Sequence, residues 1–130
     1  MQRYGRVLKL REGAEAEYDR LHTAVWPKML AAIRQSGIRN YSIFRYERWL
    51  FSYFELADGV SLKSVGKIFA ACPACAEWEK LMHEIQEPLP ESGKENWWVP
   101  MKEVFRYDGA DVMFNNLITK GELNEIREFK

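Results

Sequence analysis

The chain lacks an excess of charge of either sign, because 19 lysine and arginine residues balance 19 aspartate and glutamate residues. It therefore has no net field that favours nucleic acid or an anionic membrane, and we exclude both as partners. The sequence also lacks a run of about 18 apolar residues, the length that spans a membrane, and its first residues lack the apolar core of a signal peptide. We therefore expect a cytoplasmic protein.

Cysteine is scarce, with two residues, Cys72 and Cys75, in the order Cys-Pro-Ala-Cys. One interpretation is a redox pair or half of a zinc site, with His83 as a third ligand. However, a second cysteine pair is missing, and the motif interrupts a helical region instead of following a strand. We therefore expect Pro73 to start a helix, where its missing N–H costs nothing.

Aromatic residues are plentiful, at 14% of a 130-residue chain whose length suits one domain. Tyr18, His22 and Trp26 are spaced four apart directly before Pro27, a spacing that brings side chains to one face of a helix. Imidazole has an unperturbed pKa of about 6.5, so His22 is the first candidate for proton transfer near neutrality. The same stripe is also typical of a buried helix face.

The hydrophobic pattern predicts the order β-α-β-β-α-β, which is typical of the ferredoxin-like plait, an α+β fold. Expected strands cover residues 4–10, 38–46, 49–56 and 97–107, and expected helices cover 15–36, with a break near Trp26, and 62–85, with a break near Pro73. Strand 49–56 carries apolar side chains on both faces, so helices on one face of the sheet leave the other uncovered. We expect two such sheets to pack across a two-fold axis as a dimeric α/β barrel.

The ferredoxin-like domain is expected to span residues 1–108, followed by a C-terminal extension at 109–130. Residues 112–114 of this extension are apolar, and residues 121–130 are charged and favour a helix. The sequence leaves open whether the extension contacts a partner subunit.

Five motifs occur in order along the chain: Tyr18-x3-His22-x3-Trp26-Pro27, then GIRNYSIF at 37–44, LFSYFE at 50–55, WEKLM at 78–82 and MKEVF at 101–105. Over about residues 1–108 the chain thereby resembles the L-rhamnose mutarotase family. The resemblance implies a dimeric, cofactor-free enzyme that interconverts the α and β anomers of a 6-deoxy sugar. A related branch acts on L-fucose, and these residues do not separate the two sugars.

The resemblance assigns the family's acid/base histidine to His22 and its two sugar-contacting tyrosines to Tyr18 and Tyr41. Opening a sugar ring requires a proton for the ring oxygen and removal of the anomeric hydroxyl proton. Acid and base groups each contribute about 10²–10⁴ in rate, so neither a metal nor a cofactor is required. Our hypothesis is that His22 protonates the ring oxygen, that Tyr41 or a water it holds serves the anomeric hydroxyl, and that Tyr18 positions other hydroxyls.

The family's sugar-stacking tryptophan corresponds to Trp78. Family members carry a second tryptophan after it, where this chain has Glu79, and a basic residue before the histidine, where it has Leu21. The Glu79 carboxylate can accept hydrogen bonds from sugar hydroxyls, so we include it among the substrate-binding residues. Trp78 is also spaced as a residue of the helix core.

Two other classes of function stay open at this point. A dimeric ferredoxin-like monooxygenase or haem-degrading protein also places a helix histidine beside aromatic rings, and a small-molecule sensing module has the same fold without catalysis. We expect His83 to be a surface residue. For Trp97 and Trp98 we favour packing at the dimer interface over closure of the site.

Overall fold

The computed structural model describes residues 1–109. The stretches at 112–114 and 121–130 lie outside the described residues. The elements are β1 (Gln2–Leu10), α1 (Glu15–His22), α2 (Pro27–Ser36), β2 (Ile38–Tyr46), β3 (Trp49–Leu56), α3 (Leu62–Ala70), α4 (Pro73–Ile85), β4 (Gln86–Glu87) and β5 (Val99–Met101). Among residues 1–109, no helix is long and apolar enough to cross a membrane.

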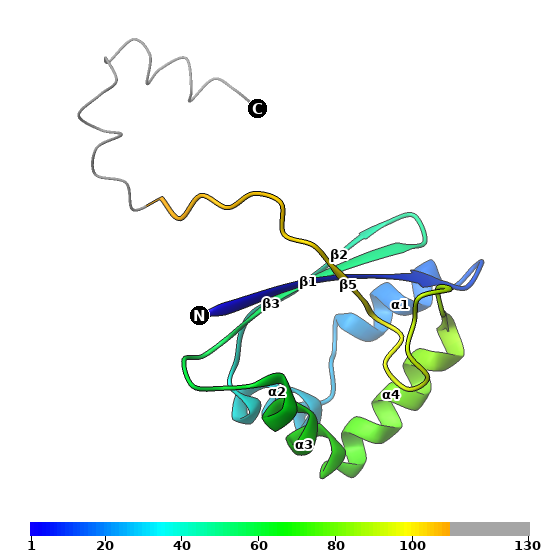
Figure 1. The fold of residues 1–130 in the computed structure, drawn as a ribbon. Coiled ribbons are helices and arrows are strands. Elements are labelled where there is room, and N and C mark those ends of the chain that lie inside the picture. The colour runs from blue at the N-terminus through cyan, green and yellow to red at the C-terminus, as the bar shows by residue number, and fades with distance from the viewer. Residues whose placement is uncertain (110–130) are drawn as a thin grey trace.

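The strands form one antiparallel sheet with β1 at its centre. The order is β2-β3-β1, and the free side of β1 pairs with β5 along residues 5–7 and with β4 along residues 9–10. All four helices lie on the same side of this sheet (Figure 1). The order of strands and the one-sided layer of helices confirm the predicted α+β, ferredoxin-like fold.

The last strand is much shorter than predicted. Pairing stops at Met101, and residues 102–108 form no strand, so the predicted boundaries of 97–107 were wrong. The apolar alternation in this stretch was interpreted as a half-buried strand. In the single chain, however, the side chains of Val104 and Phe105 are 87% and 81% exposed, so no burial offsets the cost of ordering further residues.

The first helix also ends earlier than predicted. Helix α1 ends at His22, and Thr23 caps it by donating from Oγ1 to the Arg20 carbonyl at 2.7 Å. Trp26 is extended at φ −57° and ψ 135°, since the residue before a proline is disfavoured in helical geometry, and Pro27 then starts α2. The prediction that Trp26 shares a helix face with Tyr18 and His22 was therefore wrong.

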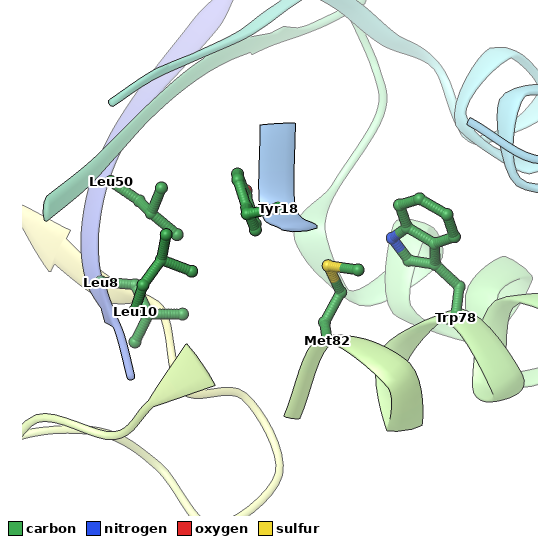
Figure 2. Close-up of a cluster of buried hydrophobic side chains, with 6 residues drawn as sticks. All are labelled: Leu8, Leu10, Tyr18, Leu50, Trp78 and Met82. Carbon is green, nitrogen blue, oxygen red and sulfur yellow. The ribbon is translucent and has the colours of Figure 1, made fainter. Parts of the chain in front are cut away.

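One of two core clusters lies between the sheet and helices α1 and α4. Figure 2 shows Tyr18 between the strand leucines on one side and Trp78 and Met82 on the other. The leucines Leu8, Leu10 and Leu50 are fully buried. Burying side chains of this size stabilises the fold by about 1.5–3 kcal/mol each. This cluster fixes the sheet-facing sides of α1 and α4, the two helices that carry the predicted histidine and tryptophan.

Candidate active site

A cavity of about 540 Å³ opens between α1, α2 and β2, with α4 contributing one side chain. Four of the five predicted site residues line it, namely Tyr18, His22, Tyr41 and Trp78. The other lining residues are Asp19, Thr23, Val25, Met29, Leu30, Ile33, Ser42, Ile43 and Arg45. A mostly apolar hollow with a few convergent polar groups is typical of a small-molecule site.

A β-bulge turns Tyr41 toward the helices. The register between β2 and β3 shifts between Arg39 and Ser42, so one residue of β2 has no partner on β3. Asn40 adopts φ 51° within the bulge, a left-handed conformation that asparagine tolerates better than most residues, and its Nδ2 donates to Glu55 Oε1 at 3.0 Å. Beyond the bulge, Ile43 pairs with the buried Ser52, so Tyr41, two residues earlier, faces the helices as well.

His22 is held at the end of α1 by a hydrogen bond to the preceding turn. Its Nδ1 lies 2.8 Å from the Tyr18 carbonyl oxygen, which can only accept, so Nδ1 carries the proton and Nε2 keeps its lone pair. The imidazole stacks on the Tyr18 ring at 4.1 Å between centroids, and it meets the Trp78 ring nearly at right angles, with 5.4 Å between the two centroids. Burial lowers the pKa of His22, against a smaller raising effect of the Tyr18 carbonyl and of Asp19. At neutral pH the imidazole is therefore an uncharged base.

Arg6 contacts Tyr41 from the central strand, and the sequence reasoning missed it. Its Nη2 donates to the Tyr41 hydroxyl at 3.4 Å, and its guanidinium carbon lies 4.8 Å from the centre of the Phe54 ring and 5.3 Å from that of Trp98. Among the described residues, its buried Nε has no hydrogen-bond partner. The sequence does contain a signal for it: Arg6 lies two residues before Leu8, so the alternation of the strand places a charged side chain on the buried face.

The two tyrosines keep their protons at neutral pH. Burial raises the pKa of Tyr41, and the Glu79 charge raises it further. The Arg6 charge and the hydrogen bond from Arg6 lower this pKa but do not cancel the increase. Burial likewise raises the pKa of Tyr18 well above its usual range. Both phenols are therefore hydrogen-bond donors at the cavity.

An ion pair on the rim of the cavity was also missed. Arg45 donates from Nε and Nη2 to the two carboxylate oxygens of Asp19, at 2.8 and 2.6 Å. This bidentate contact lowers the pKa of Asp19 and joins α1 to β2 beside His22. Arg45 lies two residues after Ile43, so both side chains face the helices. This placement indicates the contact only once the bulge is known.

The remaining predicted site residue, Glu79, does not line the cavity. Its carboxylate lies 2.8 Å from His83 Nε2, and half of its side chain is exposed. His83 stacks on Trp97 at 3.7 Å between ring centres, and only a quarter of its side chain is exposed. His83 is therefore a surface residue that Trp97 covers in part.

The cysteine motif lies at the start of α4, and neither cysteine lines the cavity. Both thiols are free, and Pro73 is the first residue of the helix, which confirms that prediction. In the part of the chain that the structure describes, no group of three or more His, Cys, Asp or Glu side chains gathers as a metal site. His83 therefore does not join Cys72 and Cys75 in one cluster.

Comparisons with known proteins identify close relatives. The family model described as L-rhamnose mutarotase matches residues 3–107. A protein of Listeria monocytogenes named L-rhamnose mutarotase is 34% identical over 107 residues, covering 81% of this chain and 97% of its own. One from Opitutus terrae with the same name is 31% identical over 104 residues, covering 78% and 94%.

Two solved structures share the fold. An L-rhamnose mutarotase from Formosa agariphila superposes with a TM-score of 0.65 at 22% identity, covering 83% of this chain and 100% of that one. Tetracenomycin F2 cyclase from Streptomyces glaucescens superposes with a TM-score of 0.53 at 13% identity, covering 82% and 99%. At these identities the likeness concerns the fold alone.

Proposed function

This chain belongs to the L-rhamnose mutarotase family, and from that premise we propose that it interconverts the α and β anomers of L-rhamnose at the cavity. The observation that carries the proposal is that α1, β2 and α4 bring an uncharged imidazole, two protonated phenols and an indole to one hollow. These groups suffice for ring opening, which needs one base and one acid.

The hydrogen bonding of His22 supports a division of roles. Nε2 is the basic nitrogen, so we propose that it removes the anomeric hydroxyl proton as the bond between the anomeric carbon and the ring oxygen breaks. The Tyr41 hydroxyl, or a water it holds, gives a proton to the ring oxygen, and Arg6 stabilises the phenolate that remains. This reverses our sequence-based hypothesis, in which His22 protonated the ring oxygen.

Ring closure restores both groups. Rotation about the bond between the first two sugar carbons presents the other face of the open-chain aldehyde. The Tyr41 phenolate then takes back the proton from the hydroxyl that attacks, while protonated His22 returns its proton to the carbonyl oxygen. The protein ends each cycle unchanged, so the reaction consumes no other reactant.

Trp78 and Tyr18 would hold the sugar. The Trp78 indole is nearly perpendicular to the His22 ring, at 74°, so it offers an apolar surface beside the imidazole. We propose that this surface packs against the methyl group and apolar face of a 6-deoxy sugar, and that the Tyr18 hydroxyl binds a sugar hydroxyl. We propose that Glu79, next to Trp78, accepts a hydrogen bond from a further sugar hydroxyl. The Glu79 charge raises the pKa of Tyr41, which supports a position close to the site.

Exchange NMR with L-rhamnose tests the proposal. We expect the rate of exchange between the signals of the two anomers to be higher with the wild-type chain than in buffer alone. The His22→Ala variant should stay folded and lose this increase. Lys63→Ala is the control, since Lys63 is an exposed residue of α3 and does not line the cavity. An active His22→Ala variant would overturn the assignment. L-fucose and D-glucose in parallel samples determine which sugar is preferred.

The same samples separate the two other classes of function. Binding of L-rhamnose without exchange would indicate a sensing module. A Soret band on addition of haem would indicate a haem-dependent relative.

We also propose that the chain is a homodimer that buries the sheet face opposite the helices. Phe44 pairs across the hairpin with Phe51, and Tyr46 with Trp49. These side chains lie on the face without helices, and Phe44 and Tyr46 are 67% and 70% exposed in the single chain. Apolar rings at this density are typical of an interface between subunits.

Sedimentation velocity tests the dimer. The wild type should sediment as a dimer and Phe44→Glu as a monomer. Leu62→Glu, which adds the same charge at an exposed apolar residue of α3, should leave the dimer intact. A monomeric wild type would overturn this part of the proposal.

A further inference from the structure

The first turn of α4 is capped by a sulfur atom. Cys72 is the N-cap, and its Sγ accepts a hydrogen bond from the Cys75 backbone N–H at 3.2 Å. Serine, threonine, aspartate and asparagine usually occupy this position, because their oxygens are good acceptors, whereas a neutral thiol is a weak one. The positive end of the helix dipole favours an anion here, so the position selects the thiolate form of Cys72.

The two thiols of the motif differ in exposure and in pKa. Cys72 is partly exposed, whereas Cys75 is 5% exposed in the core. A side-chain hydrogen bond from Cys75 lowers the pKa of Cys72, assisted by backbone N–H groups and by Lys28 of α2. Burial raises the pKa of Cys75 to about 12. The outer sulfur is thus the nucleophile, and the inner sulfur is a thiol in contact with it.

A second opening gives access to the outer sulfur. It has a volume of about 400 Å³ and lies between α2 and the junction of α3 with α4. Cys72, Ala71 and Ile68 line one side, and Lys28 and Gln35 line the other. Lys28 is the single charged residue among the lining residues that the structure describes. The opening therefore suits a small molecule that carries carboxylates.

We propose that Cys72 and Cys75 form a thiol–disulfide exchange site for small, carboxylate-bearing disulfides. The Cys72 thiolate attacks one sulfur of the small disulfide; a mixed disulfide forms, and the other half leaves as a thiolate that takes a proton from water. Cys75 then loses its proton to water and attacks Cys72 Sγ, which releases the second half as a thiol. The protein dithiol is oxidised by two electrons, and the small disulfide is reduced to two thiols.

The backbone allows the protein disulfide to close. The rise and radius of a helix place Cα atoms three residues apart roughly 5 Å from each other, within the range of about 4.4–6.8 Å between Cα atoms that disulfides span. The exchange does not involve the sugar cavity, so it does not depend on the proposed mutarotase activity.

Mass spectrometry of the reduced full-length chain treated with glutathione disulfide tests this site. The wild type should lose two hydrogen atoms in mass and release two glutathione molecules. Cys75→Ala should stop at a mixed disulfide carrying one glutathione. Cys72→Ser should react far more slowly, and because serine is a preferred N-cap, circular dichroism should show an intact helix content.

Two further measurements separate an activated thiol from an ordinary one. Alkylation of Cys72 by iodoacetamide in the reduced wild type, followed at its own peptide by mass spectrometry, should have a pH midpoint below about 8.5, the pKa of a free cysteine. Lys28→Ala should slow the reaction with glutathione disulfide more than that with the uncharged hydroxyethyl disulfide. The proposal is overturned if the wild type accumulates the mixed disulfide without closing, or if Cys72→Ser reacts as fast as the wild type.

Discussion

Replacement of Arg6 by methionine tests the link between the central strand and the reacting atoms. Methionine retains the apolar stem against Phe54 and removes the cation. In the resting enzyme the Nη2 of Arg6 lies 3.4 Å from the Tyr41 hydroxyl, longer than the usual 2.7–3.2 Å or so, so little ground-state binding should be lost. In the proposed mechanism, the contact strengthens as negative charge develops on the phenol.

The size of the effect follows from this difference. Hydrogen bonds to charged groups contribute about 1.5–3 kcal/mol, and the long resting distance favours the lower end. We therefore expect kcat to fall roughly tenfold, since about 1.4 kcal/mol corresponds to that factor, with KM nearly unchanged. Polarimetry on freshly dissolved L-rhamnose, combined with exchange NMR near equilibrium, gives both constants.

A double-mutant cycle supplies the decisive control. In a Tyr41→Phe background the phenol is absent, so Arg6→Met should cost almost nothing more. Arg34→Met, at an exposed position of α2, controls for the loss of a positive charge. Full activity of Arg6→Met, or an equal loss in both backgrounds, would refute the role of Arg6 at Tyr41.

Three further predictions follow from the geometry of the site. Burial lowers the pKa of His22, and its neutral form is the proposed base, so activity should be constant above about pH 6.5 and fall only below it. An acid limb centred above that pH in a pH–rate profile would contradict this. Tyr18→Phe should raise KM with little change in thermal stability. Tyr18→Ala should destabilise the fold by about 3–5 kcal/mol in urea unfolding, because it leaves a cavity in the core; equal stability of the two variants would argue against the packing role. Asn40→Val should lower the free energy of unfolding by about 1–2 kcal/mol and reduce activity, because a β-branched residue disfavours φ 51°. Asn40→Gly should change both urea unfolding and anomer exchange less, and the reverse order would refute the role of the bulge.

Elements with local signals were predictable from the sequence. The hairpin 38–56 was predicted because two β-rich runs flank the polar pair at 47–48, and the end of α2 because Gly37 readily adopts the left-handed φ of 89°. The candidate residues on α1 and α4 were likewise found by spacing and by the family resemblance. Each of these signals lies within a few neighbouring residues.

Features that depend on pairing between distant segments were missed. The bulge at Asn40 exists only relative to the register of β3, and Arg6 reaches Tyr41 from 35 positions away in the sequence. The length of β5 was overestimated because alternation at 102–107 does not reveal whether anything covers the apolar side chains. Glu79 remains a prediction, since its contact with His83 describes the chain without a sugar.

Tyr18 and Trp78 belong both to the buried core and to the lining of the cavity. If the cavity is the sugar site, as proposed, redesign of the enzyme for another sugar is constrained, because changes at these two residues also affect folding. Asp19, Leu30 and Arg45 line the same cavity from exposed positions. Randomised libraries at these three rim residues should retain more folded variants, and laboratory evolution of sugar preference has most freedom there.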